Sequence, residues 1–599
     1  MTVLLARRAT GLLQQFNAAG ILGLADVHTA RRVAALGGEP DETVQLAVAL
    51  TVRALRLGSV CLDLPRVHLT TVTDEPVALP WPEPRAWLAA CRRSPLVTAD
   101  QGPVRLVGEL LYLDRYWRQE DQVRHELLTR AAAPGPAVDH ARLRADLDRL
   151  FPADGGCQRL AAAVSTLRPV SVLAGGPGTG KTTTIARLLA VLAAQPGGPL
   201  RIALAAPTGK AAARLEEAVR EVTATLPGAD RAALGDLHAS TIHRLLGRRP
   251  GSHTRFRHDR SNRLPYDVVV VDETSMVSLT LMARLLEAVR PEARLVLVGD
   301  PDQLASVEAG AVLGDIVRAG GPPEPALHEA LAGLLEPGQQ VVNGVVTLTR
   351  TWRFGGAIAA LATAVRTGDV DAALDVLASG DPAVVFTGPD DVDGLRSDTL
   401  AALGAVTGAA VAGDAAAALA ALDAHRVLCA HREGPYGVTR WTREIARWRG
   451  VDATADLDPG RPLLITANDY DSGLYNGDTG VIVDTPDGMR AAFARGGTPV
   501  LVPPSRLSSA ETLYALTVHR SQGSQFGKVS LILPEAGSPL LTRELLYTAV
   551  TRARTGLRIL GTPDGIRAAV ERPVARATGL RDSLAAPTSN GGRETPTPG

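Results

Sequence analysis

The chain has 599 residues, of which 45% are apolar, 21% charged and 4% aromatic, and its 63 basic side chains are balanced by 63 acidic ones. A chain of this length is expected to fold into about four domains, each with its own hydrophobic core, and the composition excludes an intrinsically disordered protein. The charge balance excludes a uniformly basic coat for nucleic acid but leaves room for a local basic channel.

The chain contains four scattered cysteines: Cys61, Cys91, Cys157 and Cys429. Because they lack the CxxC spacing of zinc sites and disulfide frameworks, we expect a protein of the reducing cytoplasm. Residues 1–15 lack the long apolar stretch of a signal peptide. Residues 400–422 are rich in Ala and Gly but are interrupted by Asp414, so we expect a helix of a soluble protein there and not a membrane span.

Residues 1–115 carry apolar side chains at helical spacing, most clearly at 44–50, but no motif for a nucleotide or for DNA. We interpret this region as an N-terminal partner-docking domain. The alternative is that it only braces the domain that follows. A stretch rich in Pro, Gly and Ala at 131–137 then precedes a further helical run.

From Val170 onward, short apolar runs alternate with helical patterns, which predicts an α/β fold with a parallel sheet. Four of these runs are typical of buried central strands: residues 170–174, 201–205, 268–271 and 295–298. Each run ends where a polar motif begins, and in open α/β sheets ligands bind at these carboxyl ends. We assign residues 116–347 to a first α/β domain and residues 348–566 to a second one.

The middle of the second α/β domain has a different pattern. Strand-like runs at 462–466, 480–483 and 499–502 are separated by turn sequences rich in Gly, Asn and Pro. This pattern predicts a small β-barrel inserted at about residues 460–507. Residues 567–599 form a C-terminal extension, whose tail from about residue 586 is expected to be disordered.

A phosphate-binding loop follows the strand that begins at Val170. The cofactor-binding residues expected here are Gly175, Gly176, Pro177, Gly178, Thr179, Gly180, Lys181, Thr182 and Thr183. The glycines let backbone N–H groups converge on phosphate oxygens, Lys181 reaches the β- and γ-phosphates, and Thr182 offers its hydroxyl to Mg²⁺. An ordinary glycine-rich turn would not explain Lys and Thr at these offsets. Upstream of the loop, Gln158 is placed to read an adenine edge, although an isolated glutamine is more often a solvated helix residue.

The strand at 268–271 leads directly into two adjacent carboxylates, Asp272 and Glu273. Because adjacent carboxylates repel each other unless a cation shares the site, we expect Asp272 to hold Mg²⁺ and Glu273 to orient or deprotonate an attacking water. The alternative interpretation is an acidic cap on the helix that begins near Ser275.

Four later motifs occur in a fixed order: Val298–Leu304 (VGDPDQL), Thr349–Phe354 (TRTWRF), Thr517–Phe526 (TVHRSQGSQF) and Tyr547–Arg554 (YTAVTRAR). Together with the phosphate loop, they resemble the motifs of superfamily 1 DNA helicases. Four further stretches resemble one branch, the RecD family, the alpha subunit of exodeoxyribonuclease V: residues 206–215, 240–247, 305–310 and 432–438. The motif around Arg353 often carries Tyr in that family where this chain has Trp352, and both side chains are flat aromatics.

The resemblance implies two RecA-like motor domains and an ATP-dependent translocase that moves 5′ to 3′ on single-stranded DNA. The implied assembly is a RecBCD-like heterotrimer with RecB-like and RecC-like partners, which acts on duplex ends in double-strand break repair. In this family Gln303 would sense the γ-phosphate of ATP. Arg353 and Arg552 would approach from the second motor domain and neutralise charge on the transferred phosphoryl group.

The same resemblance places the DNA-binding residues in three short segments: Pro207, Thr208 and Lys210; Thr241 and His243; and Thr517, His519 and Arg520. Hydroxyl, imidazole and cationic groups suit backbone phosphates better than base edges, so we expect binding that does not depend on sequence.

A nuclease site of the metal-dependent kind needs a lysine near paired carboxylates. Besides Lys181 and Lys210 the chain has only Lys528, which has no acidic neighbours in the sequence. DNA cutting is therefore expected in a partner subunit. Three alternatives remain: a stand-alone RecD-like helicase, a conjugative relaxase-type motor, and a catalytically silent structural subunit. The lack of a relaxase tyrosine domain argues against the second, and the intact motifs argue against the third.

Overall fold

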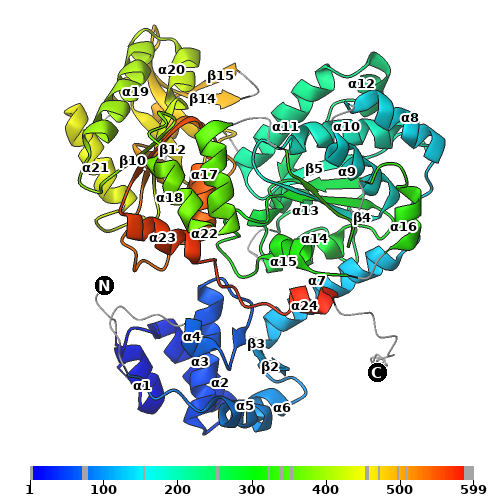
Figure 1. Cartoon of the computed structure of the whole chain (residues 1–599), viewed down its shortest axis with the longest axis vertical. Coiled ribbons are helices and arrows are strands. Elements are labelled where there is room, and N and C mark those ends of the chain that lie inside the picture. The colour runs from blue at the N-terminus through cyan, green and yellow to red at the C-terminus, as the bar shows by residue number, and fades with distance from the viewer. Residues whose placement is uncertain are drawn as a thin grey trace.

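The computed structural model describes residues 5–7, 9–70, 78–152, 155–249, 255–321, 324–335, 341–350, 355–451, 457–469, 472–495, 498–507 and 509–585. Three parts are visible in Figure 1: a helical N-terminal lobe below, and two α/β domains side by side above it. Among the described residues, no helix combines the length and the apolar character that crossing a membrane requires.

The N-terminal lobe packs helices around a three-stranded sheet of order β1-β3-β2. Its elements are α1 (Gly11–Ala18), α2 (Leu24–Gly37), α3 (Glu42–Arg56), β1 (Leu62–Asp63), α4 (Val67–Thr70), α5 (Pro84–Arg93), α6 (Pro95–Thr98), β2 (Val104–Val107) and β3 (Leu110–Leu113). The lobe has a core of its own, in which Phe16 and Leu46 are fully buried. Helix α3 lies at its centre because its apolar positions recur at helical spacing, as the sequence predicts.

The first α/β domain contains a six-stranded sheet of order β6-β5-β7-β8-β4-β9, in which all neighbouring strands run parallel. Its strands are β4 (Val170–Gly175), β5 (Ile202–Ala206), β6 (Ala239–Thr241), β7 (Val268–Val271), β8 (Arg294–Gly299) and β9 (Val345–Leu348). Four valines make up β7, and all of them are buried, which is typical of a central strand covered on both faces. The four strands expected from the sequence are therefore present, at the expected positions.

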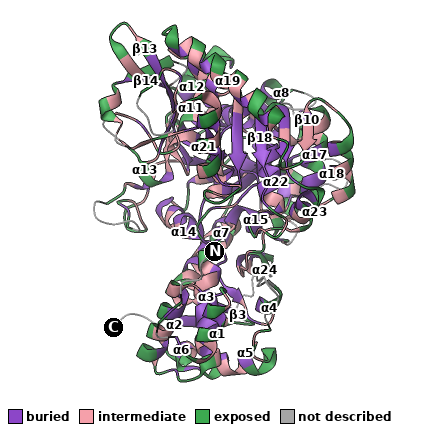
Figure 2. Ribbon diagram, turned by 90° about the vertical axis from the view of Figure 1, so that its left-hand side faces the viewer, coloured by how far each residue is buried: buried purple, intermediate pink, exposed green. Residues whose placement is uncertain are grey.

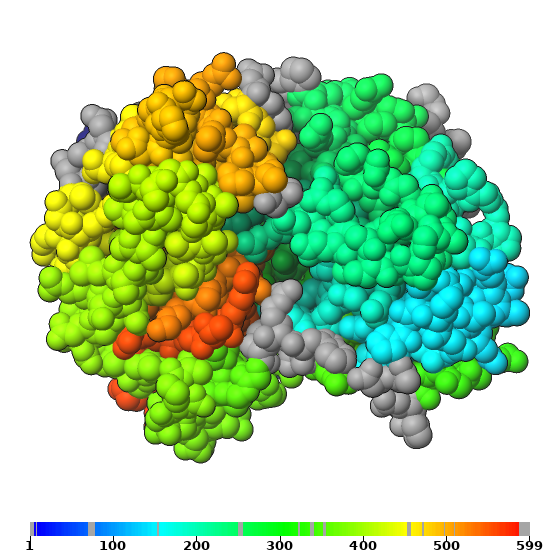
Figure 3. Space-filling view, turned by 90° about the horizontal axis from the view of Figure 1, so that it is seen from above, coloured from blue at the N-terminus to red at the C-terminus, as the bar shows by residue number. Residues whose placement is uncertain are grey.

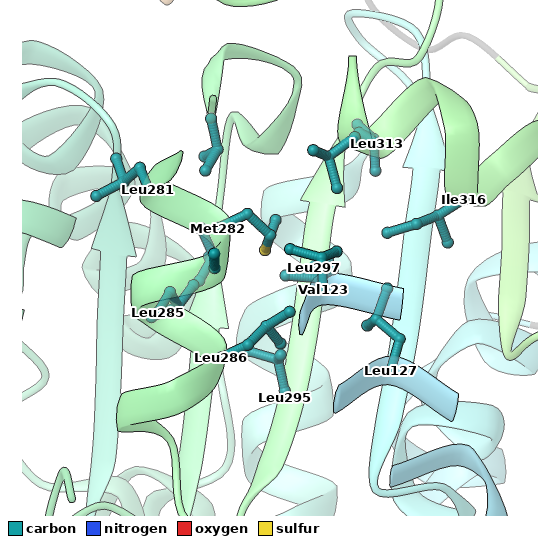
Figure 4. Close-up of a cluster of buried hydrophobic side chains, with 14 of the residues drawn as sticks. Val123, Leu127, Leu281, Met282, Leu285, Leu286, Leu295, Leu297, Leu313 and Ile316 are labelled. Atoms are coloured by element: carbon teal, nitrogen blue, oxygen red, sulfur yellow. The ribbon is translucent and has the colours of Figure 1, made fainter. Parts of the chain in front are cut away.

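Helices cover both faces of this sheet. One face carries α7 (Asp114–Ala132), α13 (Ile242–Leu246), α14 (Leu279–Ala288) and α15 (Val312–Arg318). The other face carries α8 (His140–Leu150), α9 (Gly156–Leu167), α10 (Lys181–Ala194), α11 (Gly209–Ala224), α12 (Gly228–Leu234) and α16 (Pro325–Ala330). In the first of these layers, Leu286 of α14 lies beside Leu295 of β8, and Leu127 of α7 lies below Ile316 of α15 (Figure 4).

The second α/β domain contains a five-stranded parallel sheet of order β10-β19-β18-β11-β17. Its strands are β10 (Val384–Thr387), β11 (His425–Cys429), β17 (Ala515–Thr517), β18 (Phe526–Ile532) and β19 (Ala553–Leu560). The helices around it are α17 (Gly356–Thr367), α18 (Val370–Ala378), α19 (Asp393–Val411), α20 (Ala415–Leu422), α21 (Val438–Arg449), α22 (Arg543–Val550) and α23 (Pro563–Glu571). Strand β18 lies in the buried centre of the domain (Figure 2). The Ala-rich stretch at 400–422 forms the second half of α19 and the whole of α20.

An antiparallel five-stranded sheet of order β15-β14-β13-β12-β16 is inserted into the second α/β domain. Its strands are β12 (Pro462–Ile465), β13 (Thr479–Thr485), β14 (Gly488–Arg495), β15 (Thr498–Val502) and β16 (Ala510–Thr512). The sequence indicates three of these strands and misses β14 and β16. Among the described residues, β15 and β16 are the two edges and do not pair with each other, so the closed barrel stays a prediction.

A C-terminal strap, residues 572–579, leads from α23 back to the first α/β domain. There the chain forms α24 (Leu580–Ala585), beside α7 and α15 (Figure 1). Arg576 donates hydrogen bonds to the carbonyl of Ser306 at 2.7 Å and to that of Gly310 at 2.9 Å. The Thr578 hydroxyl donates to Glu120 at 2.9 Å. The strap thus joins both α/β domains, and the tail expected to be disordered, 586–599, lies outside the described residues.

A candidate nucleotide site in the cleft between two domains

The two α/β domains face each other across a cleft, which is visible as a hollow from above (Figure 3). Within it lies a cavity of about 640 Å³. The first domain contributes these lining residues: Pro177, Gly178, Gly180, Lys181, Thr182, Thr183, Ala211, Arg214, Leu215, Glu217, Ala218, Glu221, Asp272, Glu273 and Gln303. The second domain contributes Asp423, Gly523, Ser524, Gln525, Arg552 and Arg554. The cleft therefore brings together most of the residues that the sequence assigns to phosphate chemistry.

The two sheets meet the cleft through opposite edges. In the first domain the lining residues follow the carboxyl ends of β4, β7 and β8, as expected for an open α/β sheet. In the second domain Asp423, Gln525 and Arg552 stand just before β11, β18 and β19, at the amino ends of those strands. The second domain thus completes the site of the first domain from the other side of the cleft, and does not form a second site of the same kind.

The phosphate loop connects β4 to α10, and its backbone shape depends on glycine. Gly178 and Gly180 have φ angles of +79° and +85°, a region that other residues rarely adopt. The first helical residue is Lys181, whose ammonium donates to the carbonyls of Gly175 at 2.7 Å and Gly176 at 2.9 Å. Its charge is held over the loop, at the helix N-terminus that attracts phosphate.

The acidic pair stands at the end of β7. Glu273 has a φ of +50°, and it is one of two described non-glycine residues with a positive φ. Such a conformation stores about 1–3 kcal/mol of strain and is typical of functional sites. Burial, followed by the neighbouring Glu273 carboxylate, raises the pKa of Asp272 to about 6, although Lys181 opposes the rise. The two crowded carboxylates and the Thr182 hydroxyl line the same cavity, and such a set of oxygen ligands fits Mg²⁺.

Gln303 and Arg552 hold each other across the cleft. Arg552 donates to the side-chain oxygen of Gln303 at 3.0 Å, and the two residues are 3% and 5% exposed. The guanidinium also donates to the carbonyls of Ser524 and Thr548, at 3.0 and 3.1 Å. Next to Gln303, the backbone N–H of Leu304 donates to the Thr548 hydroxyl at 3.0 Å. The two domains therefore meet directly at the residues expected to respond to the γ-phosphate.

Tyr547 and Asp300 form a second contact across the cleft, which the sequence reasoning missed. The Tyr547 hydroxyl donates to Asp300 at 3.2 Å, and Asp300 also accepts from the Gln303 amide at 2.8 Å. A Cβ on Gly176 would lie 2.8 Å from the same tyrosine oxygen, so this glycine leaves room for the ring. Both residues lie in motifs recognised in the sequence, and this was the signal that could have identified them.

Two residues predicted for the site, Gln158 and Arg353, are not found among the described residues that line the cavity. Gln158, on α9, donates its amide to the carbonyl of Thr179 at 3.2 Å and is not among the residues that line the cavity. It braces the phosphate loop, and its contact with an adenine stays a prediction. Arg353 lies outside the described residues.

The candidate DNA-binding residues lie near strand ends and the domain interface. β5 and β6 pair in parallel, with Ala206 beside Thr241, and so Pro207 and Thr208 come next to Thr241. Both threonines are helix caps: the Thr208 hydroxyl accepts from the Ala211 N–H and the Thr241 hydroxyl from the Arg244 N–H, each at 3.2 Å.

His243 packs beside the Phe256 ring, 5.9 Å between centroids, and burial lowers its pKa. In the second domain, the Thr517 hydroxyl accepts from the backbone N–H of Arg520 at 3.3 Å. Burial, with a smaller effect of Arg576, lowers the pKa of His519. Neutral imidazoles can still donate a hydrogen bond to a phosphate oxygen.

Lys210 stands apart from this group. It lines a second cavity of about 290 Å³ that is bordered by α11, α20 and the inserted sheet. Burial lowers its pKa to about 7, and the nearby Arg214 adds to the effect. Its contact with DNA stays a prediction.

Three family models match the chain. Residues 18–112 match the N-terminal domain of RecBCD enzyme subunit RecD, residues 158–309 match an AAA domain, and residues 512–560 match a UvrD-like helicase C-terminal domain. The AAA match contains the phosphate loop, and the UvrD-like match contains the whole Tyr547–Arg554 motif.

Relatives match along almost the whole chain. The RecBCD enzyme subunit RecD of Mycolicibacterium smegmatis is 54% identical over 583 residues, which is 96% of this chain and 99% of the relative. The protein of the same name from Mycobacterium tuberculosis is 51% identical over 589 residues, 97% and 98% of the two chains. The ATP-dependent RecD2 DNA helicase of Deinococcus radiodurans is 33% identical over 427 residues, 69% of this chain and 50% of that helicase.

Proposed function

The chain belongs to the RecD family, and from this membership and the cleft we propose that it is an ATP-dependent DNA helicase that moves 5′ to 3′ as one motor of a RecBCD-like complex. The observation that carries the proposal is the Gln303–Arg552 hydrogen bond, because it joins the two α/β domains in the cavity that the phosphate loop also lines. A stand-alone RecD-like helicase is less favoured, since the RecD2 relative is matched over only half of its length.

The residues of the first domain bind ATP. The N–H groups at the start of α10 and the Lys181 ammonium hold the β- and γ-phosphates. When ATP binds, the ammonium gives up its hydrogen bonds to the two loop carbonyls and donates to the phosphate oxygens instead. The Thr182 hydroxyl and the Asp272 carboxylate hold Mg²⁺, which supplies charge compensation for the phosphate oxygens. Glu273 orients the attacking water and takes up its proton.

The residues of the second domain complete the site. Arg552 shifts from Gln303 to the γ-phosphate, where it offsets the charge that develops during transfer, and Arg353 is proposed for the same task. When Gln303 loses this partner, its segment is free to change its contacts with Thr548.

Movement along DNA follows from the same segment. The Gln522 amide donates to the Leu304 carbonyl at 2.6 Å, and Gln522 lies two residues beyond Arg520, a proposed DNA contact. A change at the γ-phosphate thus reaches both the interface and the residues that hold the DNA backbone. ATP hydrolysis is thereby coupled to a change between two conformations that bind the DNA strand with different affinity.

We further propose the domain division 1–115, 116–347, 348–566 and 567–599. The first part docks on a RecC-like chain, DNA cutting resides in a RecB-like chain, and the assembly works in the cytoplasm. The start of α7 at Asp114, which leads from the lobe onto the first sheet, supports the first boundary.

The test is DNA-stimulated ATP hydrolysis and unwinding of forked DNA with a single 5′ or 3′ overhang, by the full chain alone and with its partner chains. We expect hydrolysis that depends on single-stranded DNA and a preference for the 5′ overhang. A silent structural subunit would show neither activity in either state, and a preference for the 3′ overhang would overturn the direction. Full unwinding without partners would favour a stand-alone helicase.

A further inference from the structure

The nucleotide cavity continues past the acidic pair, and the sheet order shows in which direction. The strands stand in the order β5-β7-β8-β4. They carry, in turn, Arg214 (on α11, which follows β5), Glu273, Gln303 and Lys181. Helix α9, with Gln158, packs at the opposite end, against β9. A nucleotide whose base points toward α9 therefore directs its terminal phosphate toward β8 and β7, and α11 lies beyond it.

Arg214, on α11, is a cation that lines the nucleotide cavity beyond the acidic pair. Its guanidinium donates to the carbonyl of Gly523, across the cleft. Its pKa is lowered by burial; Asp423 and Glu273 act to raise it, and Arg552 lowers it further. Arg214 therefore shares one electrostatic environment with the proposed water-activating carboxylate and the proposed phosphate-binding arginine.

Arg214, Glu217 and Asp423 line both cavities and so form the wall between them. The second cavity of about 290 Å³ also touches Thr498 and Pro499, both of which are exposed. The second cavity reaches the surface between α11 and the inserted sheet, so a path through this shared wall would lead from the phosphate end of the nucleotide site to the surface.

We propose that this route is the exit for inorganic phosphate, with Arg214 as the first group to receive the cleaved phosphate. The proposal rests on the proposed ATP hydrolysis. Arg214 and Arg554 attract the anion away from Lys181, while Glu217, Glu221 and Asp423 repel it. A lining of mixed sign suits passage, because a route must attract an ion enough for entry and bind it weakly enough for departure.

The experiment compares two time courses in the full chain with saturating single-stranded DNA. Quenched-flow measurement of labelled ATP reports the cleavage step, and a fluorescent phosphate-binding sensor reports release. The variants are Arg214→Gln, Arg214→Lys and Asp423→Asn. Arg220→Gln is the matched control, because Arg220 is exposed on the same helix and lines neither cavity.

In Arg214→Gln we expect cleavage in the first turnover to be unchanged and phosphate release to slow about tenfold, the effect of losing one charge-assisted hydrogen bond. Arg214→Lys should restore most of the release rate. Asp423→Asn should make added inorganic phosphate a stronger inhibitor, because one repulsive charge is lost. The control should match the wild type in every measurement.

Three results would overturn the proposal. If release keeps pace with cleavage in Arg214→Gln and Asp423→Asn leaves phosphate inhibition unchanged, phosphate leaves elsewhere. If cleavage itself slows in Arg214→Gln, the arginine acts on the reaction. If Arg214→Gln does not fold, phosphate inhibition that is unchanged in Asp423→Asn refutes the route. A wild-type chain without DNA-stimulated hydrolysis would instead refute the proposed function.

Discussion

Replacing Arg552 with lysine separates the charge of this residue from its geometry. The guanidinium donates to three acceptors at 3.0 to 3.1 Å, on Gln303, Ser524 and Thr548, and to the Thr551 hydroxyl at 3.4 Å. The ammonium of a lysine, which is a single nitrogen on a different side chain, cannot donate to all of these acceptors at once. Since each buried hydrogen bond to a charged group contributes about 1.5–3 kcal/mol, the loss of one of them should lower the free energy of unfolding by that amount, and the loss of two by roughly 3–6 kcal/mol.

The same substitution should also slow ATP hydrolysis. Loss of a well-placed transition-state contact costs about 3–4 kcal/mol, so we expect kcat of Arg552→Lys to fall by roughly 10²- to 10³-fold. The fall should appear equally in kcat and kcat/KM, because the contact with the phosphate forms in the transition state.

The assay is steady-state ATP hydrolysis with saturating single-stranded DNA, with urea unfolding of the same samples. Arg567→Lys is the control, since Arg567 is exposed on α23 in the same domain. A lysine variant that is stable and keeps the wild-type kcat would refute the reasoning, because charge alone would then be sufficient at this position.

Three further predictions concern the first domain and its contact with Tyr547. Lys181→Gln should leave the circular dichroism spectrum unchanged and lower ATP turnover by roughly 10²- to 10³-fold, measured with and without DNA. In the metal-free protein burial and the neighbouring Glu273 carboxylate raise the pKa of Asp272 to about 6, so protons compete with Mg²⁺ for this carboxylate, and the Mg²⁺ concentration that gives half-maximal hydrolysis should rise as the pH falls through this value. In metal-free protein the ionised form is the unfavourable one, so Asp272→Asn should raise the melting temperature at pH 8 but not at pH 4. Tyr547→Phe removes only the hydroxyl that donates to Asp300, and should lower kcat about tenfold while the melting temperature falls only slightly; an unchanged kcat would show that this contact is structural.

The phosphate chemistry of the first domain was predictable because it is local in the sequence. Each motif directly follows a buried apolar strand, as Asp272 and Glu273 follow the four valines of β7. Strand order in a parallel sheet then brings the motifs together without further information.

The contacts that cross the cleft could not be predicted in this way. Tyr547 meets Asp300 over 247 positions of the chain, and Arg214 meets Gly523 over 309. Only the packing of the two domains decides such pairs. Strand β14 was missed for a different reason: its sequence, Gly488–Arg495, contains three alanines and a glycine, which have weak strand propensity, and β13 and β15 hold it in place from both sides.

The strap has a consequence for how the protein is made. Leu580 and Leu584 of α24 belong to the same buried cluster as Val123 of α7 and Ile316 of α15. A ribosome completes the other strands and helices of that domain long before residue 580 emerges, so the apolar face that α24 covers remains uncovered during synthesis of the whole second domain. The final packing of this cluster therefore waits for α24. Nascent chains that stop early would expose this face to chaperones and proteases, which gives the cell a simple way to remove incomplete motors before they can join a partner.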